Sequence, residues 1–254
     1  MGIERSFTFA FKAPGGTAKV VLGGLFSLLF FTVFFPFAVM GYLMRVLCNA
    51  LEGRDAKLPD WELGSLFNEG LMPVVIVLVY AAPVMAVVAA NQLTLNWIGL
   101  EMAIVIPLML LEIVFGVAAA LLIPLALIRF AVTRSLKAAF DLKRILGFIR
   151  RNKGQYFTAW GLSLGVGAVV GFVIFIVAVI AFVVAWVLTD VFAALAVSGV
   201  AMAIVGLFLS FVSNLIPMHL YANAYRSSTP FDDDDDGELR SSMAIPPPLS
   251  KQDD

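Results

Sequence analysis

One ionisable residue lies deep within an apolar stretch of the sequence, and it is the strongest candidate for chemistry. Glu112 is the only charged residue between positions 102 and 128. In a helix it would lie about 15 Å from the start of that stretch, near the middle of a bilayer. A carboxyl group there costs on the order of 3 kcal/mol, so it should face protein and find a partner. Such an acid serves as hydrogen-bonding glue between helices or as a proton or cation relay.

The expected partner of this acid is Tyr80. The loop between the two apolar stretches centres near Asn96, and Tyr80 and Glu112 each lie sixteen residues from that point. An antiparallel helical hairpin would bring both to one depth. Gly116 and Ala119 are small and share the helical face of Glu112, which suits a packed interface. We therefore expect the Tyr80 hydroxyl to hydrogen-bond to the Glu112 carboxyl.

No other set of residues is arranged for catalysis or metal binding. The sequence has one cysteine, Cys48, and one histidine, His219, which leaves a zinc, haem or iron–sulfur site almost without ligands. The aspartate run at 232–236 lacks the alternating ligands and distant glutamate of a calcium loop. We expect a protein that is not an enzyme, with no cofactor, no bound metal and no nucleic-acid partner.

The elements that must position Glu112 are membrane helices. Of 254 residues, 61% are hydrophobic and 14% are charged, so too few polar residues are present to cover a soluble domain. The sequence predicts an all-α polytopic membrane protein with one membrane domain at 17–225, an N-terminal segment at 1–16 and a disordered acidic tail at 226–254. Four stretches are long enough to span a bilayer, namely 71–90, 102–128, 156–188 and 191–220.

Lysine and arginine collect on one side of these stretches. Segment 129–153 holds eight of them against Asp141 alone, whereas the loops at 91–101 and 189–190 hold none. The positive-inside rule then places 129–153, 45–70 and both termini in the cytoplasm, in a multi-pass protein of the cell (inner) membrane.

The first apolar run, 20–44, has basic residues on both flanks, including Lys19 before it and Arg45 after it. Both flanks therefore look cytoplasmic, and Pro36 lies where a helix could break. These features favour a re-entrant helical hairpin that returns to its starting side, with a single full span as the alternative. Each of three apolar hairpins is then followed by a polar segment, which is a weak internal repeat in hydropathy.

Three further segments carry candidate interfaces. Segment 58–71 predicts a short amphipathic helix on the membrane surface that bends at Gly70 and Pro73 into the next span. Segment 129–153 is also amphipathic and would dock on anionic lipid or an acidic partner, or its charges would only fix the topology. The candidate interface residues of 58–71 are Pro59, Trp61 (at headgroup level), Leu66, Phe67 and Gly70.

Two pairs of glycines, each with a spacing of four residues, lie in the apolar stretch 156–188. This spacing permits close helix–helix contact, either within the chain or with a second copy in a homo-oligomer. We expect contact within the chain, because a polytopic protein packs its own helices first. The candidate packing residues are Gly161, Gly165, Gly167 and Gly171.

Several short motifs resemble an uncharacterised prokaryotic polytopic membrane-protein family, the domain of unknown function 4013. They are "GYLMR" at 41–45, "LPDWELGSLFNEGL" at 58–71, "YAAP" at 80–83 and "SLKAAFDLKRILGFIRRNKGQYF" at 135–157. The resemblance extends over most of 17–225 and implies a helical membrane fold, but it implies no activity. Two functions stay open: a non-catalytic scaffold or accessory subunit of a membrane complex, and a small transporter or channel with a midplane polar site around Glu112. The scarcity of polar groups in the spans favours the first.

Overall fold

The computed structural model describes residues 15–28, 34–54, 58–93, 102–188, 190–228 and Phe231. Within these ranges the chain forms eight helices and no strand. The predicted all-α class is therefore confirmed. The helices are α2 (Gly16–Leu28), α3 (Phe34–Leu51), α4 (Leu63–Leu93), α5 (Met102–Thr133), α6 (Leu136–Ala139), α7 (Leu142–Arg151), α8 (Lys153–Leu188) and α9 (Val191–Arg226).

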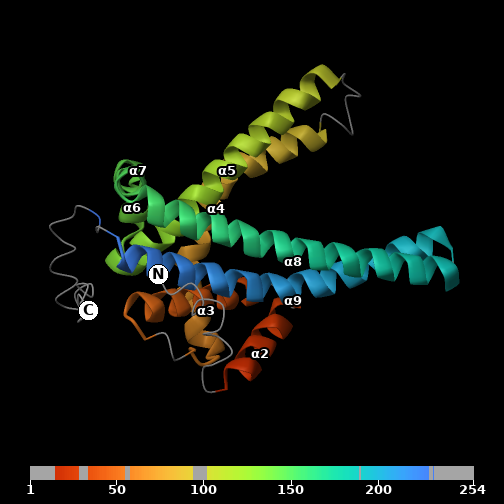
Figure 1. Cartoon of the computed structure of the whole chain (residues 1–254), viewed down its shortest axis with the longest axis horizontal. Coiled ribbons are helices and arrows are strands. Elements are labelled where there is room, and N and C mark those ends of the chain that lie inside the picture. Colours follow the sequence, from red (N-terminus) through yellow and green to blue (C-terminus); the bar gives the residue numbers. More distant parts are fainter. Residues whose placement is uncertain are drawn as a thin grey trace, which may run out of the picture.

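Four of these helices, α4, α5, α8 and α9, are long and apolar enough to cross a membrane, which confirms the four predicted spans. They form two hairpins, α4–α5 and α8–α9, which meet at one end and diverge toward the other (Figure 1). We call the shared end the base. It consists of α3, α6, α7 and the nearby ends of the long helices, at about residues 63–80, 119–133, 153–160 and 211–226.

The buried core is concentrated in the base. It includes a continuous run in α5, Leu125–Val132, and most residues of α9 between Leu220 and Tyr225. In the most apolar 18 residues of each long helix, only 6–11% of the residues are buried inside the protein. The outer halves of both hairpins therefore present their apolar side chains to the surroundings, as expected for helices in contact with lipid.

Helices α2 and α3 form a third, shorter hairpin against the base. At the start of α2, the Lys19 Nζ donates to the Leu58 carbonyl at 2.9 Å and pairs with Asp60 at 2.7 Å. In the second half of α3, the Tyr42 ring stacks on Trp61 with ring centroids 4.1 Å apart. Because the start of α2 and the later part of α3 both meet residues 58–61, the chain returns to the side from which it came, as predicted for 20–44.

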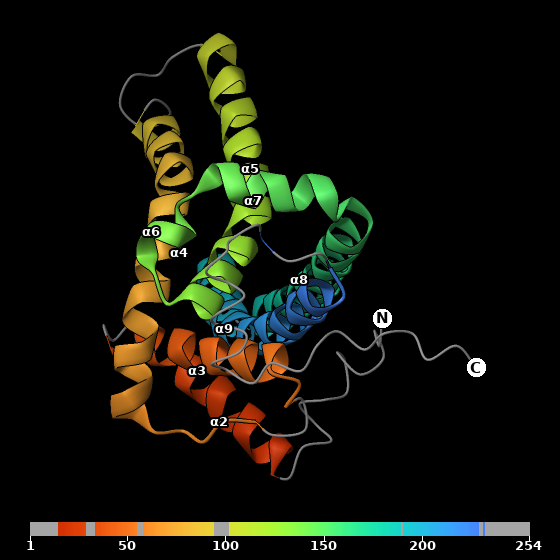
Figure 2. The same ribbon diagram turned by 90° about the vertical axis from the view of Figure 1, so that its left-hand side faces the viewer.

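The polar segment after α5 crosses the base toward α8 (Figure 2). Arg134 ends α5 with a left-handed φ of +53°, which turns the chain into α6. Asp141 then caps α7, since its carboxylate accepts from the Arg144 N–H at 3.2 Å. The described parts of the three polar segments, at 45–62, 134–152 and 226–231, all lie at the base, so they share one side of the molecule. That this side is cytoplasmic stays a prediction.

One expected element is wrong. The predicted surface helix at 58–71 is not separate, because α4 continues from Leu63 through Pro73 and Pro83 to Leu93. Prolines are tolerated inside membrane helices where neighbouring groups satisfy the freed backbone. Pro73 is buried in the base. Of the apolar residues at 63–71, Leu66 is buried and Gly70 lies against the backbone of α3, whereas Leu63 and Leu71 stay exposed.

Candidate functional site

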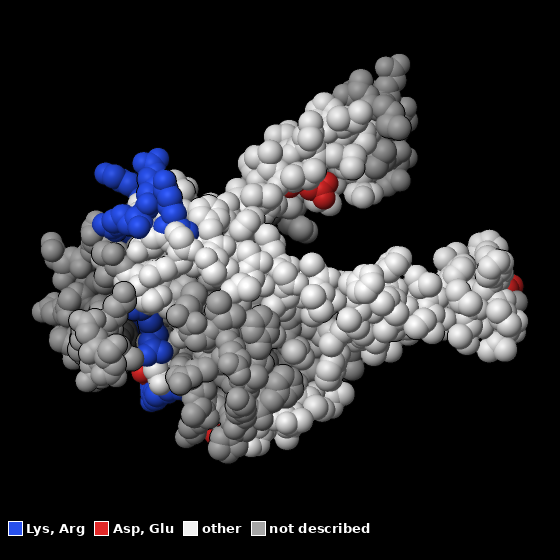
Figure 3. All heavy atoms as spheres, in the orientation of Figure 1, with Lys and Arg blue, Asp and Glu red and all other residues white. Residues whose placement is uncertain are grey.

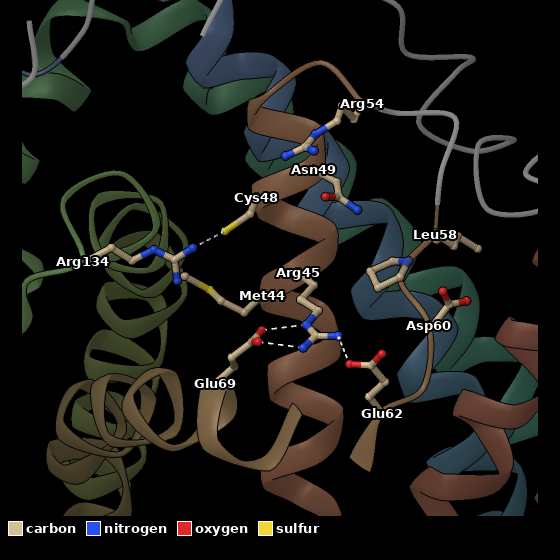
Figure 4. Close-up of a pocket in the computed structure, with 11 residues that line it drawn as sticks. Met44, Arg45, Cys48, Asn49, Arg54, Leu58, Asp60, Glu62, Glu69 and Arg134 are labelled. Atoms are coloured by element: carbon tan, nitrogen blue, oxygen red, sulfur yellow. Dashed lines mark hydrogen bonds and ion pairs between the residues drawn. The ribbon is translucent and has the colours of Figure 1, made fainter. Parts of the chain in front are cut away.

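A charged cavity of about 300 Å³ opens at the base, between α3, the 58–62 connection, the first turns of α4 and the junction of α5 with α6 (Figure 4). Three guanidinium groups and three carboxylates line it, together with the thiol of Cys48. The charged residues are Arg45, Arg54, Arg134, Asp60, Glu62 and Glu69.

Arg45 is the centre of this cavity. Its Nε and Nη2 donate to the two carboxylate oxygens of Glu69, both at 2.7 Å, in a bidentate pair. Nη2 also donates to the Ser65 hydroxyl at 2.9 Å, and Nη1 lies 3.7 Å from Glu62. The hydrogen bonds to Glu69 raise the pKa of Arg45, so its charge is permanent. The pair fastens α3 to the first turns of α4.

About one turn further along α3, the Cys48 sulfur accepts from the Arg134 guanidinium at 3.6 Å. Burial raises the pKa of the Cys48 thiol, and the nearby Arg134 charge opposes that shift only in part. The thiol therefore stays protonated at neutral pH and is a poor nucleophile. The cavity is suited to hold a small polar group. Among the described residues, no three side chains that could bind a metal come together.

One turn before Arg45 in α3, helices α3 and α4 cross at Gly41 and Gly70. A Cβ atom added to Gly41 would lie 1.9 Å from the Leu66 carbonyl oxygen, and one added to Gly70 would lie 1.8 Å from the Phe37 carbonyl oxygen. Both contacts are with backbone, which has little freedom to move aside. Only glycine at both positions allows the helices to approach this closely.

Trp61 fills the space beside this crossing. Its ring stacks on Tyr42 and lies 5.0 Å from Phe26 and 5.8 Å from Phe211, and its N–H donates to the Lys19 carbonyl at 3.1 Å. The ring therefore joins α2, α3 and α9 within the protein, and its position at headgroup level stays a prediction. The other residues predicted with it also serve the base: Leu66 is fully buried, Phe67 packs edge-on against Phe37, and Pro59 lines the cavity.

The expected Tyr80–Glu112 hydrogen bond is absent. The Tyr80 hydroxyl donates to the Ala139 carbonyl at 2.8 Å, and its ring lies 5.6 Å from Phe140. The short helix α6, which hydropathy does not reveal, ends beside Tyr80 and offers an unused carbonyl. Glu112 is partly exposed and makes no hydrogen bond or ion pair with any residue that the structure describes.

The predicted glycine packing in α8 is also wrong. A Cβ atom at Gly161, Gly165, Gly167 or Gly171 would meet nothing within 4 Å. All four glycines are exposed, because α9 packs on another face of α8. Contact of the glycine face with a second copy stays a prediction.

The basic segment forms an amphipathic helix only in part. In α7, Ile145 and Phe148 are buried in the base, and the lysine and arginine side chains point outward (Figure 3). Arg129 differs from the rest, since it is 1% exposed and its guanidinium lies over the Phe231 ring, 4.9 Å from the centroid. The outward basic residues of α7 and its flank are Lys143, Arg144, Arg150, Arg151 and Lys153.

The family model for "Protein of unknown function (DUF4013)" matches residues 25–179, which is more than half of the chain. The chain belongs to this family. The DUF4013 match includes the Gly41–Gly70 crossing, the charged cavity, α7 and most of α8. No curated protein and no solved structure matches the chain.

The Arg45–Glu69 pair and the role of Arg134 are not apparent from the sequence. Arg45 appears in the "GYLMR" motif and Glu69 in the "LPDW" segment, but 24 positions separate them. No local pattern joins these two residues, because they lie in different segments of the chain.

Proposed function

We propose that this DUF4013 protein is a non-catalytic accessory subunit or scaffold of a membrane complex. It is a helical protein with four apolar helices of spanning length. The observation that carries the proposal is Glu112, a carboxyl group in the apolar part of α5 with no polar partner among the described residues. The family relationship supplies no activity that would point elsewhere.

The part of α5 around Glu112 is exposed and could accept a partner. On its own helix, Met109 is 51% exposed, Leu110 58% and Ile113 60%, so this region of α5 is largely open to its environment. An ionisable group at this depth is usually paired, because leaving it unpaired in hydrocarbon costs on the order of 3 kcal/mol. A hydrogen-bond donor or a cation from another polypeptide would offset that cost.

The shape of the molecule leaves room for such a partner. The two long hairpins diverge from the base, and Figure 3 shows open space between them on the visible face. Neighbouring transmembrane helices could therefore contact α5 without displacing α8 or α9. The packed base, in which α3 contacts both α4 and α9, would keep both hairpins in a fixed orientation.

The alternative function is a small transporter or channel in which Glu112 holds a proton or a cation. The helical neighbours that share its face are Leu108, Gly116 and Ala119, none of which supplies a polar side chain. A conducting path requires further polar groups along its length. The described part of α5 between Val105 and Ile128 supplies no other charged residue, so the accessory role is favoured.

The test is purification in mild detergent from the native host, followed by identification of co-purifying proteins. We expect a stoichiometric partner with the wild type and with Glu112→Gln, which retains hydrogen bonding, and its loss with Glu112→Leu. Leu110→Ala, on an exposed face of the same helix, is the matched control and should retain the partner. The proposal fails if no protein co-purifies while reconstituted vesicles show an ion flux that Glu112→Gln abolishes.

A further inference from the structure

The C-terminal segment is fixed to the base just before its acidic run. Phe231 is only 4% exposed. Its ring lies 4.7 Å from Phe148 of α7 and 5.6 Å from Tyr225 of α9, and the Arg129 guanidinium lies 4.9 Å from its centroid. A ring held by two aromatic side chains and a cation is an anchor for the chain that follows it.

The residues after this anchor are strongly acidic. Positions 232–236 are five consecutive aspartates, and Glu238 follows two positions later, with no lysine or arginine among them. Adjacent like charges repel one another, so this run gains from any basic surface within its reach.

Helix α7 provides such a surface. Between Leu142 and Lys153 the sequence has five basic residues and no acidic residue, and the nearest acid, the capping Asp141, pairs with Arg144 at 3.2 Å. Phe148, which holds Phe231, lies on this same helix, and Arg144 and Arg151 flank it at about one turn, roughly 5–6 Å along the axis. The basic charges are exposed, whereas the anchor is buried.

The reach of the chain keeps the acidic run close to α7. Five residues extend at most about 18 Å, so all five aspartates stay within that distance of Phe231. The anchor thus holds the acids at a high effective concentration beside α7, in the millimolar range typical of short tethers. An external anionic ligand has to compete against this tethered one.

We propose that the acidic segment 232–238 docks on the basic face of α7 and occupies the surface that would otherwise bind anionic lipid headgroups. Docking of this segment does not depend on a partner at Glu112.

The test uses disulfide trapping in the full-length purified protein. Cys48→Ser removes the native thiol, and Gly147→Cys is paired with Asp234→Cys. A Cβ at Gly147 meets nothing within 4 Å, and this substitution removes no basic charge. We expect rapid cross-linking under mild oxidation at low salt, slowed about tenfold at 1 M salt, where charges more than about 3 Å apart are screened.

The matched control carries the same cysteine pair with the other four aspartates of 232–236 changed to asparagine. Cross-linking should fall about tenfold in this variant, as at high salt. Phe231→Ala should also slow the reaction, because it releases the anchor. Equal rates for the acidic and the asparagine segments at low salt would overturn the proposal.

Nanodiscs of different lipid composition show whether the acidic segment or anionic lipid occupies the α7 surface. Cross-linking that persists in nanodiscs of phosphatidylglycerol at the rate seen in phosphatidylcholine supports docking of the acidic segment. Loss of cross-linking in phosphatidylglycerol alone would mean that anionic lipid occupies the face in a membrane, and would overturn the proposal.

Discussion

Replacing Gly41 with alanine should separate α3 from α4. The added Cβ would lie 1.9 Å from the Leu66 carbonyl oxygen, and ordinary van der Waals contact begins near 3.4 Å. The helices must therefore move apart by about 1.5 Å at the crossing, because the obstacle is backbone and not a flexible side chain. That movement also stretches the 2.7 Å Arg45–Glu69 hydrogen bonds one turn away.

The magnitude follows from overpacking, which costs about 1–3 kcal/mol where neighbours can adjust, and the backbone contact places Gly41→Ala near the upper end. At about 2–4 °C per kcal/mol for a chain of this size, the apparent Tm should fall by roughly 6–12 °C. Gly70→Ala should behave in the same way, since its Cβ would lie 1.8 Å from the Phe37 carbonyl oxygen.

The assay is size-exclusion chromatography in detergent after heating to a series of temperatures. Gly165→Ala and Gly167→Ala are the matched controls, because a Cβ at either position meets nothing within 4 Å. Alanine in place of an exposed helical glycine stabilises a helix by about 0.5–1 kcal/mol. The Tm of these controls should therefore stay unchanged or rise. Equal Tm values for Gly41→Ala and Gly165→Ala would refute the close crossing.

Three other predictions concern the base and the topology. Trp61→Phe should cost about 1 kcal/mol of unfolding free energy through loss of the hydrogen bond to the Lys19 carbonyl, and Trp61→Ala about 3–5 kcal/mol, both measured by the same heating assay; equal losses would show that packing contributes nothing. Because burial raises the pKa of the Cys48 thiol, its maleimide labelling should be slower at pH 7 than that of an exposed cysteine and should accelerate toward pH 9; a rate equal to the exposed cysteine would contradict this. With Cys48→Ser and single cysteines at 8, 96 or 240, an impermeant maleimide added to intact cells should label only 96, and labelling at 8 would refute the α2–α3 hairpin.

The spans were predictable because hydropathy is a local property of the chain. Stretches of about twenty apolar residues have few alternatives to a membrane helix, so α4, α5, α8 and α9 follow from the sequence with errors only at their ends. The α2–α3 hairpin was also predictable, since the basic residues on both flanks, Lys19 and Arg45, indicate a return to the same side.

The contacts within the base were not predictable, because they join residues far apart in sequence. Nothing local to Arg45 indicates Glu69, and nothing local to Trp61 indicates Tyr42. A small-residue spacing shows where helices could approach, but the packing of α9 decides which face of α8 is used, so Gly165 stays exposed while Gly41 is enclosed. Tyr80 was misassigned because α6, only four residues long, has no hydropathy signal.

The most direct test of the accessory-subunit account is photo-crosslinking from α5 in native membranes. A photoreactive amino acid at Leu108 or Gly116, on either side of Glu112 along the same face, would report what lies beside the carboxyl group. We expect a discrete adduct with a second polypeptide from both positions, and none from Val173, which is exposed on α8. Adducts with lipid alone at both α5 positions would contradict the account.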